Sequence, residues 1–111
     1  MPEKAAERAR GGNSYFSGGL FRFPFTGLDD LENVVGPLAE ADRDRIEIDP
    51  YSESDFYSDL MRVTEGLADP DLAQKLVSSA AETVKWMKSS GVRWVLAYGR
   101  QAYEVDGKFK F

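Results

Sequence analysis

The chain has 111 residues and a formal net charge of −5, with 42% hydrophobic and 30% charged residues. This composition fits one modest folded domain and argues against wholesale disorder, and the negative charge argues against a nucleic-acid partner. The sequence contains no Cys and no His, which excludes disulfides, thiolate chemistry, Cys/His zinc sites and histidine acid–base catalysis.

The sequence also indicates a compartment. No apolar run is long enough to cross a membrane, and the charged first ten residues lack the apolar core of a secretory signal. We therefore expect a cytoplasmic protein with no membrane partner. The acidic stretch from Leu28 to Asp59 lacks the Asp-x-Asp-x-Asp-Gly pattern of a calcium loop, so we expect a solvated surface and no metal site.

The first 27 residues are rich in glycine and aromatic side chains. Two consecutive glycines in Gly11-Gly12-Asn13-Ser14 let the backbone turn sharply and present N–H groups to a pyrophosphate, with the Asn and Ser side chains as further polar contacts. The alternative is a flexible turn without a ligand. After Ser17-Gly18-Gly19, the alternation of Phe21, Phe23 and Phe25 with polar residues and proline predicts a short extended segment.

Helices are predicted between residues 28 and 91. A short one from Leu28 to Val35 ends at Gly36-Pro37. A second begins at Ser52, which with Asp55 approximates a capping box, and Gly66 lies near its end. Its apolar residues at helical spacing are Phe56, Leu60, Val63 and Leu67.

The third helix is the most clearly marked element. Asp69-Pro70 supplies a capping residue followed by proline at the first helical position, and Gly91 is the expected stop. The apolar stripe is predicted to comprise Leu72, Leu76, Ala80, Val84 and Met87. We expect this helix to pack against the core, with Trp86 and Trp94 in structural rather than ligand-stacking roles.

The C-terminal part is predicted to form β-structure. Val92, Trp94 and Leu96 alternate with other residues as in a strand, and Asp106-Gly107 is a strong two-residue hairpin turn. A lone hairpin is marginally stable in water, so this one should pair or pack with something else. The predicted fold class is therefore α+β: a Gly-rich extended loop, two to three helices and a C-terminal β-hairpin.

In this order, the features resemble the flavin-contacting stretch of the fumarate reductase/succinate dehydrogenase flavoprotein-like family of FAD-dependent oxidoreductases. Within that family, the tricarballylate-dehydrogenase-like branch is the closest. The resemblance runs from Glu3 to Phe111. It implies a partial FAD-binding domain over residues 1–111, a fragment of an α/β domain, which begins after the dinucleotide-binding turn and stops before the catalytic region. Its parts would be a flavin-contacting loop region (1–27), a helical region (28–91) and a β-hairpin (92–111).

The resemblance also implies cofactor contacts. Glu3 corresponds to the acidic residue that hydrogen-bonds the adenosine ribose, and Ser17, Gly18 and Gly19 correspond to backbone along the isoalloxazine ring. Together with Gly11, Gly12, Asn13 and Ser14, these are the expected FAD-binding residues. Because the chain has no His, the FAD would be bound non-covalently.

One substrate contact is implied as well. Arg100, in Gly99-Arg100-Gln101-Ala102, lies in the stretch that approaches the substrate pocket in the resembled branch and could pair with a carboxylate. The alternatives are a solvated Glu3, a flexible glycine loop and a surface Arg100 at a strand end.

The resemblance implies a function in hydride transfer. The intact enzyme would move a hydride between FAD and a carboxylate substrate, and no catalytic residue lies in this chain, so we expect the isolated polypeptide to be inactive. One alternative is a small non-enzymatic interaction module derived from such a flavoprotein, in which exposed aromatics from Tyr15 to Phe25 contact a partner or a second copy. Another is a reading frame that is longer at both ends.

Overall fold

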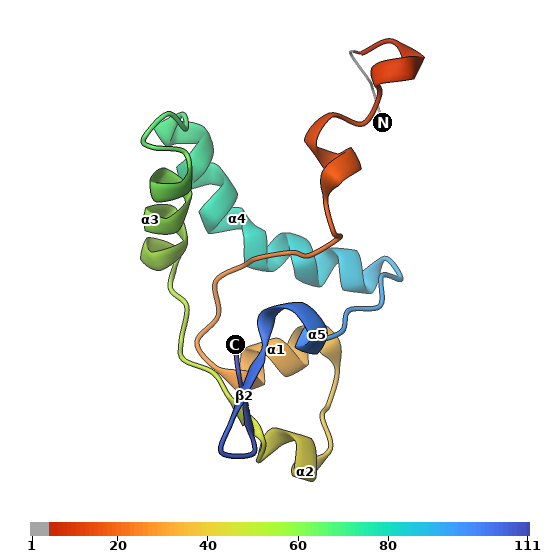
Figure 1. Cartoon of the computed structure of the whole chain (residues 1–111), viewed down its shortest axis with the longest axis vertical. Coiled ribbons are helices and arrows are strands. Elements are labelled where there is room, and N and C mark those ends of the chain that lie inside the picture. The colour runs from red at the N-terminus through yellow and green to blue at the C-terminus, as the bar shows by residue number, and fades with distance from the viewer. Residues whose placement is uncertain (1–4) are drawn as a thin grey trace.

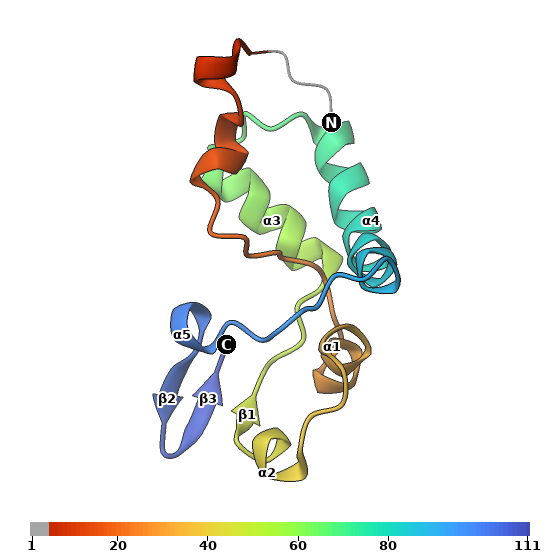
Figure 2. The same ribbon diagram turned by 90° about the vertical axis from the view of Figure 1, so that its right-hand side faces the viewer.

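The computed structural model describes residues 5–111, and within them five α-helices accompany a three-stranded sheet, which confirms the predicted α+β class. An N-terminal arm of two short 3₁₀ helices, η1 (Glu7–Ala9) and η2 (Gly12–Phe16), leads into an extended segment that crosses the middle of the molecule (Figure 1). The helices α3 and α4 lie on one side of this segment, and the remaining helices and the sheet lie on the other (Figure 2).

Local capping signals fix the α3–α4 hairpin. α3 (Glu53–Val63) begins at the predicted capping box: the Ser52 hydroxyl accepts from the Asp55 amide at 3.1 Å, and the Asp55 carboxylate accepts from the Ser52 amide at 2.9 Å. α4 (Pro70–Ser89) begins at Asp69, whose carboxylate accepts from the amides of Asp71 and Leu72, each at 3.0 Å. Both helix starts are confirmed.

The buried face of α4 matches the predicted stripe only at Ala80 and Val84. It consists of Ala73, Val77, Ala80 and Val84, whereas Leu72 is 70% and Leu76 51% exposed. Steps of four residues advance about 40° beyond a full turn each time, so the predicted series drifts around the helix. The observed 4-3-4 spacing stays on one face, and its alanines and valines allow α3 to approach closely, with Val77 packed against Phe56.

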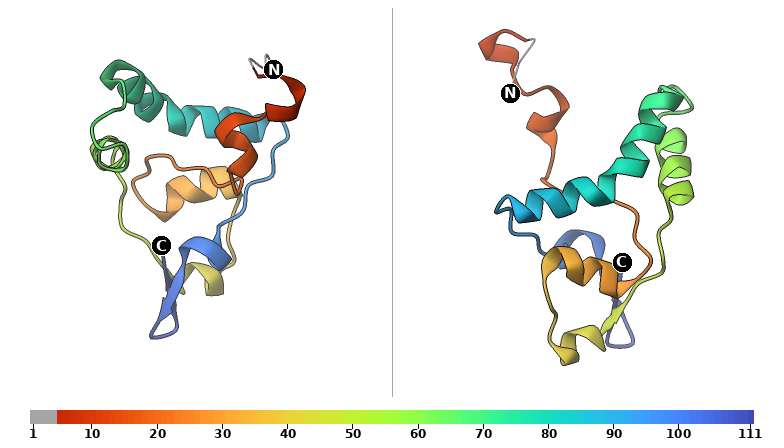
Figure 3. Two further views of the ribbon diagram at one scale, coloured as in Figure 1. Left: turned by 45° about the horizontal axis from the view of Figure 1, so that its top comes forward. Right: turned by 180° about the vertical axis from the view of Figure 1, so that it is seen from behind.

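The predicted apolar series of α3 is only partly buried, since Val63 is 66% exposed although it lies within the helix. Leu67 lies beyond the end of α3 and is 87% exposed, because the chain reverses at Glu65 and Gly66, which both have positive φ. Trp86, for which the sequence predicts a structural rather than a ligand-stacking role, is 65% exposed, because it lies on a different face of α4 from the buried residues. α4 also bends part-way along its length (Figure 3), and two hydroxyl back-bonds in its middle, Ser78 to Lys75 and Thr83 to Ser79, favour such bending.

The helix α1 (Leu28–Val35) matches its predicted bounds and ends at Gly36, where φ is 98°. Leu31 and Val34 are its buried residues, and the helix packs against α4. Arg43 of α2 (Glu40–Arg43) forms ion pairs with Glu32 and, at 2.9 Å, with Asp29. These contacts tie α2 to α1.

The predicted hairpin is confirmed, in residues 103–110. Its strands β2 (Tyr103–Val105) and β3 (Lys108–Lys110) are antiparallel, and both turn residues, Asp106 and Gly107, have positive φ. β3 also pairs in parallel with β1 (Ile46–Glu47), which gives the strand order β1-β3-β2. The expected need of the hairpin for a partner is thus met by a strand that the sequence did not reveal.

The strand predicted at Val92–Leu96 is wrong. Residues 92–97 belong to no sheet, and the short helix α5 (Tyr98–Gln101) follows them. Side chains nevertheless alternate, because Trp94 and Leu96 are half-buried while Val95 is 83% exposed. Any extended backbone produces this alternation, with or without a neighbouring strand. Trp94 is held instead by α4, since its indole N–H donates to the Val84 carbonyl at 3.3 Å.

Candidate functional site

A cavity of about 570 Å³ lies where the crossing segments meet. Its walls come from the extended segment after Gly19, from α1, from the Ile48–Tyr51 connection, from Val84 of α4 and from the Trp94–Ala97 stretch. The lining is mainly aliphatic and aromatic, with Arg22, Asp49 and Gln101 as its polar members. Volume and lining both match those of sites that bind small molecules.

Aromatic contacts fix the extended wall of the cavity. The ring of Phe21 lies edge-on to Trp94, with centroids 4.9 Å apart. Phe25 and Tyr51 exchange two backbone hydrogen bonds of 2.9 and 3.0 Å, which form an isolated antiparallel bridge. The alternating phenylalanines therefore do form an extended segment, anchored at both ends by residues distant in the sequence.

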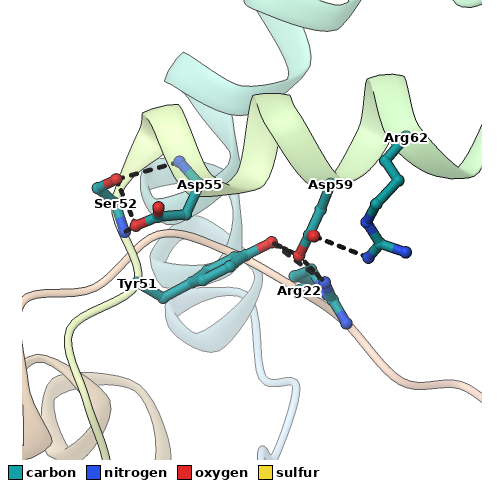
Figure 4. A network of polar contacts seen from close by, with 6 residues as sticks. All are labelled: Arg22, Tyr51, Ser52, Asp55, Asp59 and Arg62. Atoms are coloured by element: carbon teal, nitrogen blue, oxygen red, sulfur yellow. Dashed lines mark hydrogen bonds and ion pairs between the residues drawn. The ribbon is translucent and has the colours of Figure 1, made fainter. Parts of the chain in front are cut away.

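A polar network secures the same wall from outside. Arg22 donates to Tyr51 at 3.1 Å and to Asp59 of α3 at 2.9 Å, the Tyr51 hydroxyl donates to Asp59 at 2.8 Å, and Arg62 donates to the other oxygen of Asp59 at 2.8 Å (Figure 4). The hydrogen bond from Arg62, then that from Tyr51, holds the pKa of Asp59 below its usual value. Burial, which outweighs the opposite effect of the hydrogen bond from Arg22, raises the pKa of Tyr51.

Two of the predicted site residues converge at one edge of this cavity. The Arg100 guanidinium lies so close to Gly18 that a Cβ at position 18 would overlap it. The chain neighbours of these two residues, Gly19 and Gln101, both line the cavity. The predicted flavin-contacting backbone and the predicted carboxylate-binding arginine are therefore adjacent, although 82 positions separate them in the sequence.

The other predicted FAD contacts lie elsewhere. Gly11 and Gly12 have positive φ, and Gly12, Asn13 and Ser14 are exposed residues of η2, outside the cavity lining. The Ser17 hydroxyl accepts from the Gly19 amide at 3.0 Å and so shapes the turn that leads to the cavity. Glu3 lies outside the described residues.

Sequence reasoning missed the polar group of the cavity wall. Neither Arg22 nor Tyr51 is among the predicted site residues. The available signal was the position of Arg22 in an otherwise apolar extended segment, since a charged residue there needs a partner. That partner, Asp59, lies 37 positions away, and no local pattern could have identified it.

Within residues 5–111, no three His, Cys, Asp or Glu side chains are grouped so that they could hold a metal ion. In the same part of the chain, every helix is too short or too polar to cross a membrane. Comparison with protein-family models, with curated proteins and with solved structures found no match to this chain.

Proposed function

We propose that this chain is the flavin-contacting part of the FAD-binding region of a dehydrogenase or reductase that acts on a carboxylate substrate. The observation that carries the proposal is the meeting of Gly18 and Arg100 at the edge of the apolar cavity. A redox site of this class needs a surface for a flat cofactor ring beside a group that holds the substrate carboxylate. The sequence resemblance assigns these two roles to these two residues independently.

The residues present fit a flavin ring in several respects. The cavity is apolar and its volume lies within the range of small-molecule sites. At Gly19 the space where a Cβ would project is open, whereas at Gly18 the Arg100 guanidinium fills it. The Gly12–Ser14 turn is exposed to solvent and able to meet a phosphate. When bound, FAD supplies the hydride-transfer chemistry.

The chain's own residues would have binding and positioning roles. Gly18 and Gly19 would allow the backbone to lie against the ring, and the apolar wall of Phe21 and Trp94 would exclude water from it. Arg100 would pair with the substrate carboxylate through its planar guanidinium. The resemblance assigns no catalytic residue to this chain, so the isolated chain is expected to bind and not to turn over.

Titration of the purified 111-residue chain with FAD, followed by flavin fluorescence, tests the proposal. We expect saturable binding with a dissociation constant in the micromolar range. Gly18→Val should weaken it about tenfold or more, because the new side chain competes with the Arg100 guanidinium for the same space. Gly27→Val is the matched control, since a Cβ at position 27 meets nothing and its backbone is extended.

FMN separates the contributions of ring and dinucleotide. Equal affinity for FMN and FAD would mean that only the ring end is held, whereas weaker FMN binding, together with loss of the FAD preference in Asn13→Ala, would support a role for the Gly11–Ser14 turn. No binding up to about 1 mM FAD in a chain whose fold is intact would overturn the proposal.

A second candidate function is favoured by the N-terminal arm. Tyr15 is 76% and Phe16 83% exposed, and their rings contact each other edge-on rather than the body of the molecule. Exposed aromatic pairs of this kind are common where a protein meets a partner. We propose, as the alternative, an interaction module in which this arm is the contact. Phe23 and Phe25 would not take part, because they are half-buried in the chain's own fold.

A further inference from the structure

A second face of α4 carries three large apolar side chains that are mostly exposed in the described chain. The α4 stripe comprises residues at steps of four, three, four and three: Leu72, Leu76, Ser79, Thr83 and Trp86. It lies about 110° around the helix from the buried face, and its large members are 70%, 51% and 65% exposed. This spacing is that of a helix seam which packs against another helix.

The two halves of the α4 stripe have complementary shapes. The N-terminal half projects two leucine side chains, Leu72 and Leu76. The C-terminal half carries a shallow hollow of about 340 Å³, lined by Ser78, Ser79, Glu82, Thr83 and Trp86. Projecting leucines in one half, and in the other a hollow lined by serine and threonine together with Glu82 and Trp86, are the two parts of a knobs-into-holes contact.

The charges beside the stripe are complementary in the same sense. Lys75 flanks the half with the leucines, and Glu82 flanks the half with the hollow, on the same edge of the stripe. Glu82 already accepts from Lys85 at 3.0 Å, but a carboxylate has room for a further donor. Lys75 forms no ion pair within residues 5–111.

We propose that the α4 stripe pairs with the α4 stripe of a second copy of this chain, antiparallel about a two-fold axis. Leu76 then faces Ser79 of the second copy, and Leu72 faces Thr83 of the second copy. In the same register Lys75 meets Glu82 of the second copy, and the symmetry forms each contact twice. A parallel arrangement would instead set leucine on leucine and hollow on hollow, which leaves the hollows unfilled.

The contact should be modest in strength. Because α4 bends, we expect it to cover about three central turns rather than the whole helix. Such an interface is smaller than a standard stable one, so dimerisation should occur in the micromolar range and above. This proposal does not depend on flavin binding, because none of the stripe residues lines the large cavity.

Sedimentation of the whole chain from about 5 to about 500 µM tests the pairing. We expect a monomer–dimer equilibrium. Lys75→Glu and Glu82→Lys should each weaken it about tenfold, because each variant places like charges opposite each other twice. The double variant should return to within about threefold of the original constant. An equimolar mixture of the two single variants should also dimerise, because opposite charges then meet at both contacts.

Matched controls keep the outcome clear. Lys108→Glu on the hairpin reverses a charge far from the stripe and should leave the dimer unchanged, and circular dichroism checks that each variant is folded. A chain that stays monomeric at every concentration overturns the proposal. A dimer that ignores both reversals, or one that the double variant fails to restore, overturns it as well, because the contact then lies elsewhere or in another register.

Discussion

Asp59 joins three parts of the chain through one carboxylate. It accepts hydrogen bonds from Arg22 in the extended segment, from Tyr51 ahead of α3 and from Arg62 one turn further along α3 (Figure 4). The side chain is 32% exposed, so water partly screens these contacts. We therefore expect these contacts to matter for position as well as for stability, because they hold Arg22 and Tyr51 in the wall of the cavity.

The lowered pKa of Asp59 has a consequence for stability at acid pH. Because the folded-state pKa lies below that of the unfolded chain, the ionised carboxylate stabilises the fold above the unfolded-state pKa, and this stabilisation is lost as pH falls through the folded-state value. We expect Asp59→Asn to lower the melting temperature at pH 7. The variant should then lose less of its melting temperature than the original chain between about pH 5 and pH 3.

Melting curves across this pH range give the result directly. Asp44→Asn is the control, since Asp44 is exposed and its carboxylate forms no ion pair in the described chain. If the melting temperatures of Asp59→Asn and the original chain fell in parallel with pH, the network would not contribute to stability.

At the scale of elements, α4 shows what a local signal can and cannot predict. Its start was predictable because Asp69 and Pro70 act on the backbone within one turn. Which of its faces is buried was not, because that depends on where α3 and α1 lie. Large apolar side chains occur on two faces of the helix. The predicted stripe included Leu72 and Leu76, which lie on the face that is exposed to solvent. Likewise the hairpin at residues 103–110 was predictable from its turn. The two-residue strand β1, which completes the sheet, was not.

Because only one face of α4 is buried, shortening the side chains of two adjacent residues should lower the free energy of unfolding by different amounts. Val77 is 1% exposed and contacts the core, so Val77→Ala should lower the free energy of unfolding by about 2 kcal/mol. Leu76→Ala removes more atoms, but from a half-exposed side chain, and should change it by no more than about 0.5 kcal/mol. Urea unfolding followed by fluorescence below about 1 µM, where the proposed dimer is dissociated, measures both. A larger cost for Leu76→Ala would mean that the predicted rather than the observed face is buried.

The candidate site is formed by residues that are distant in the sequence and are brought together only by the complete fold. Its walls come from stretches of chain distributed between Gly19 and Phe111, and the contact between Gly18 and Arg100 closes a loop of 82 positions. The sequence named both residues through a family resemblance, but their adjacency depends on how the extended segment crosses under α4 and how α5 turns back towards it. Residues such as Arg22 and Tyr51 enter the site for the same reason, by the path of the chain rather than by any local motif.

The two tryptophans offer a direct test of this arrangement. Trp94 lines the cavity, meets Phe21 edge-on and donates to a helix carbonyl, whereas Trp86 lies on the α4 stripe and is 65% exposed. The chain has no other tryptophan, so Trp86→Phe leaves only the cavity reporter and Trp94→Phe leaves only the surface one. We expect the Trp86→Phe chain to emit at shorter wavelength and to resist acrylamide quenching more than the Trp94→Phe chain. In urea the two should become alike, because both indoles are then solvated. Equal quenching in the native state would mean that the extended segment does not cover Trp94, and the cavity would lose its aromatic wall.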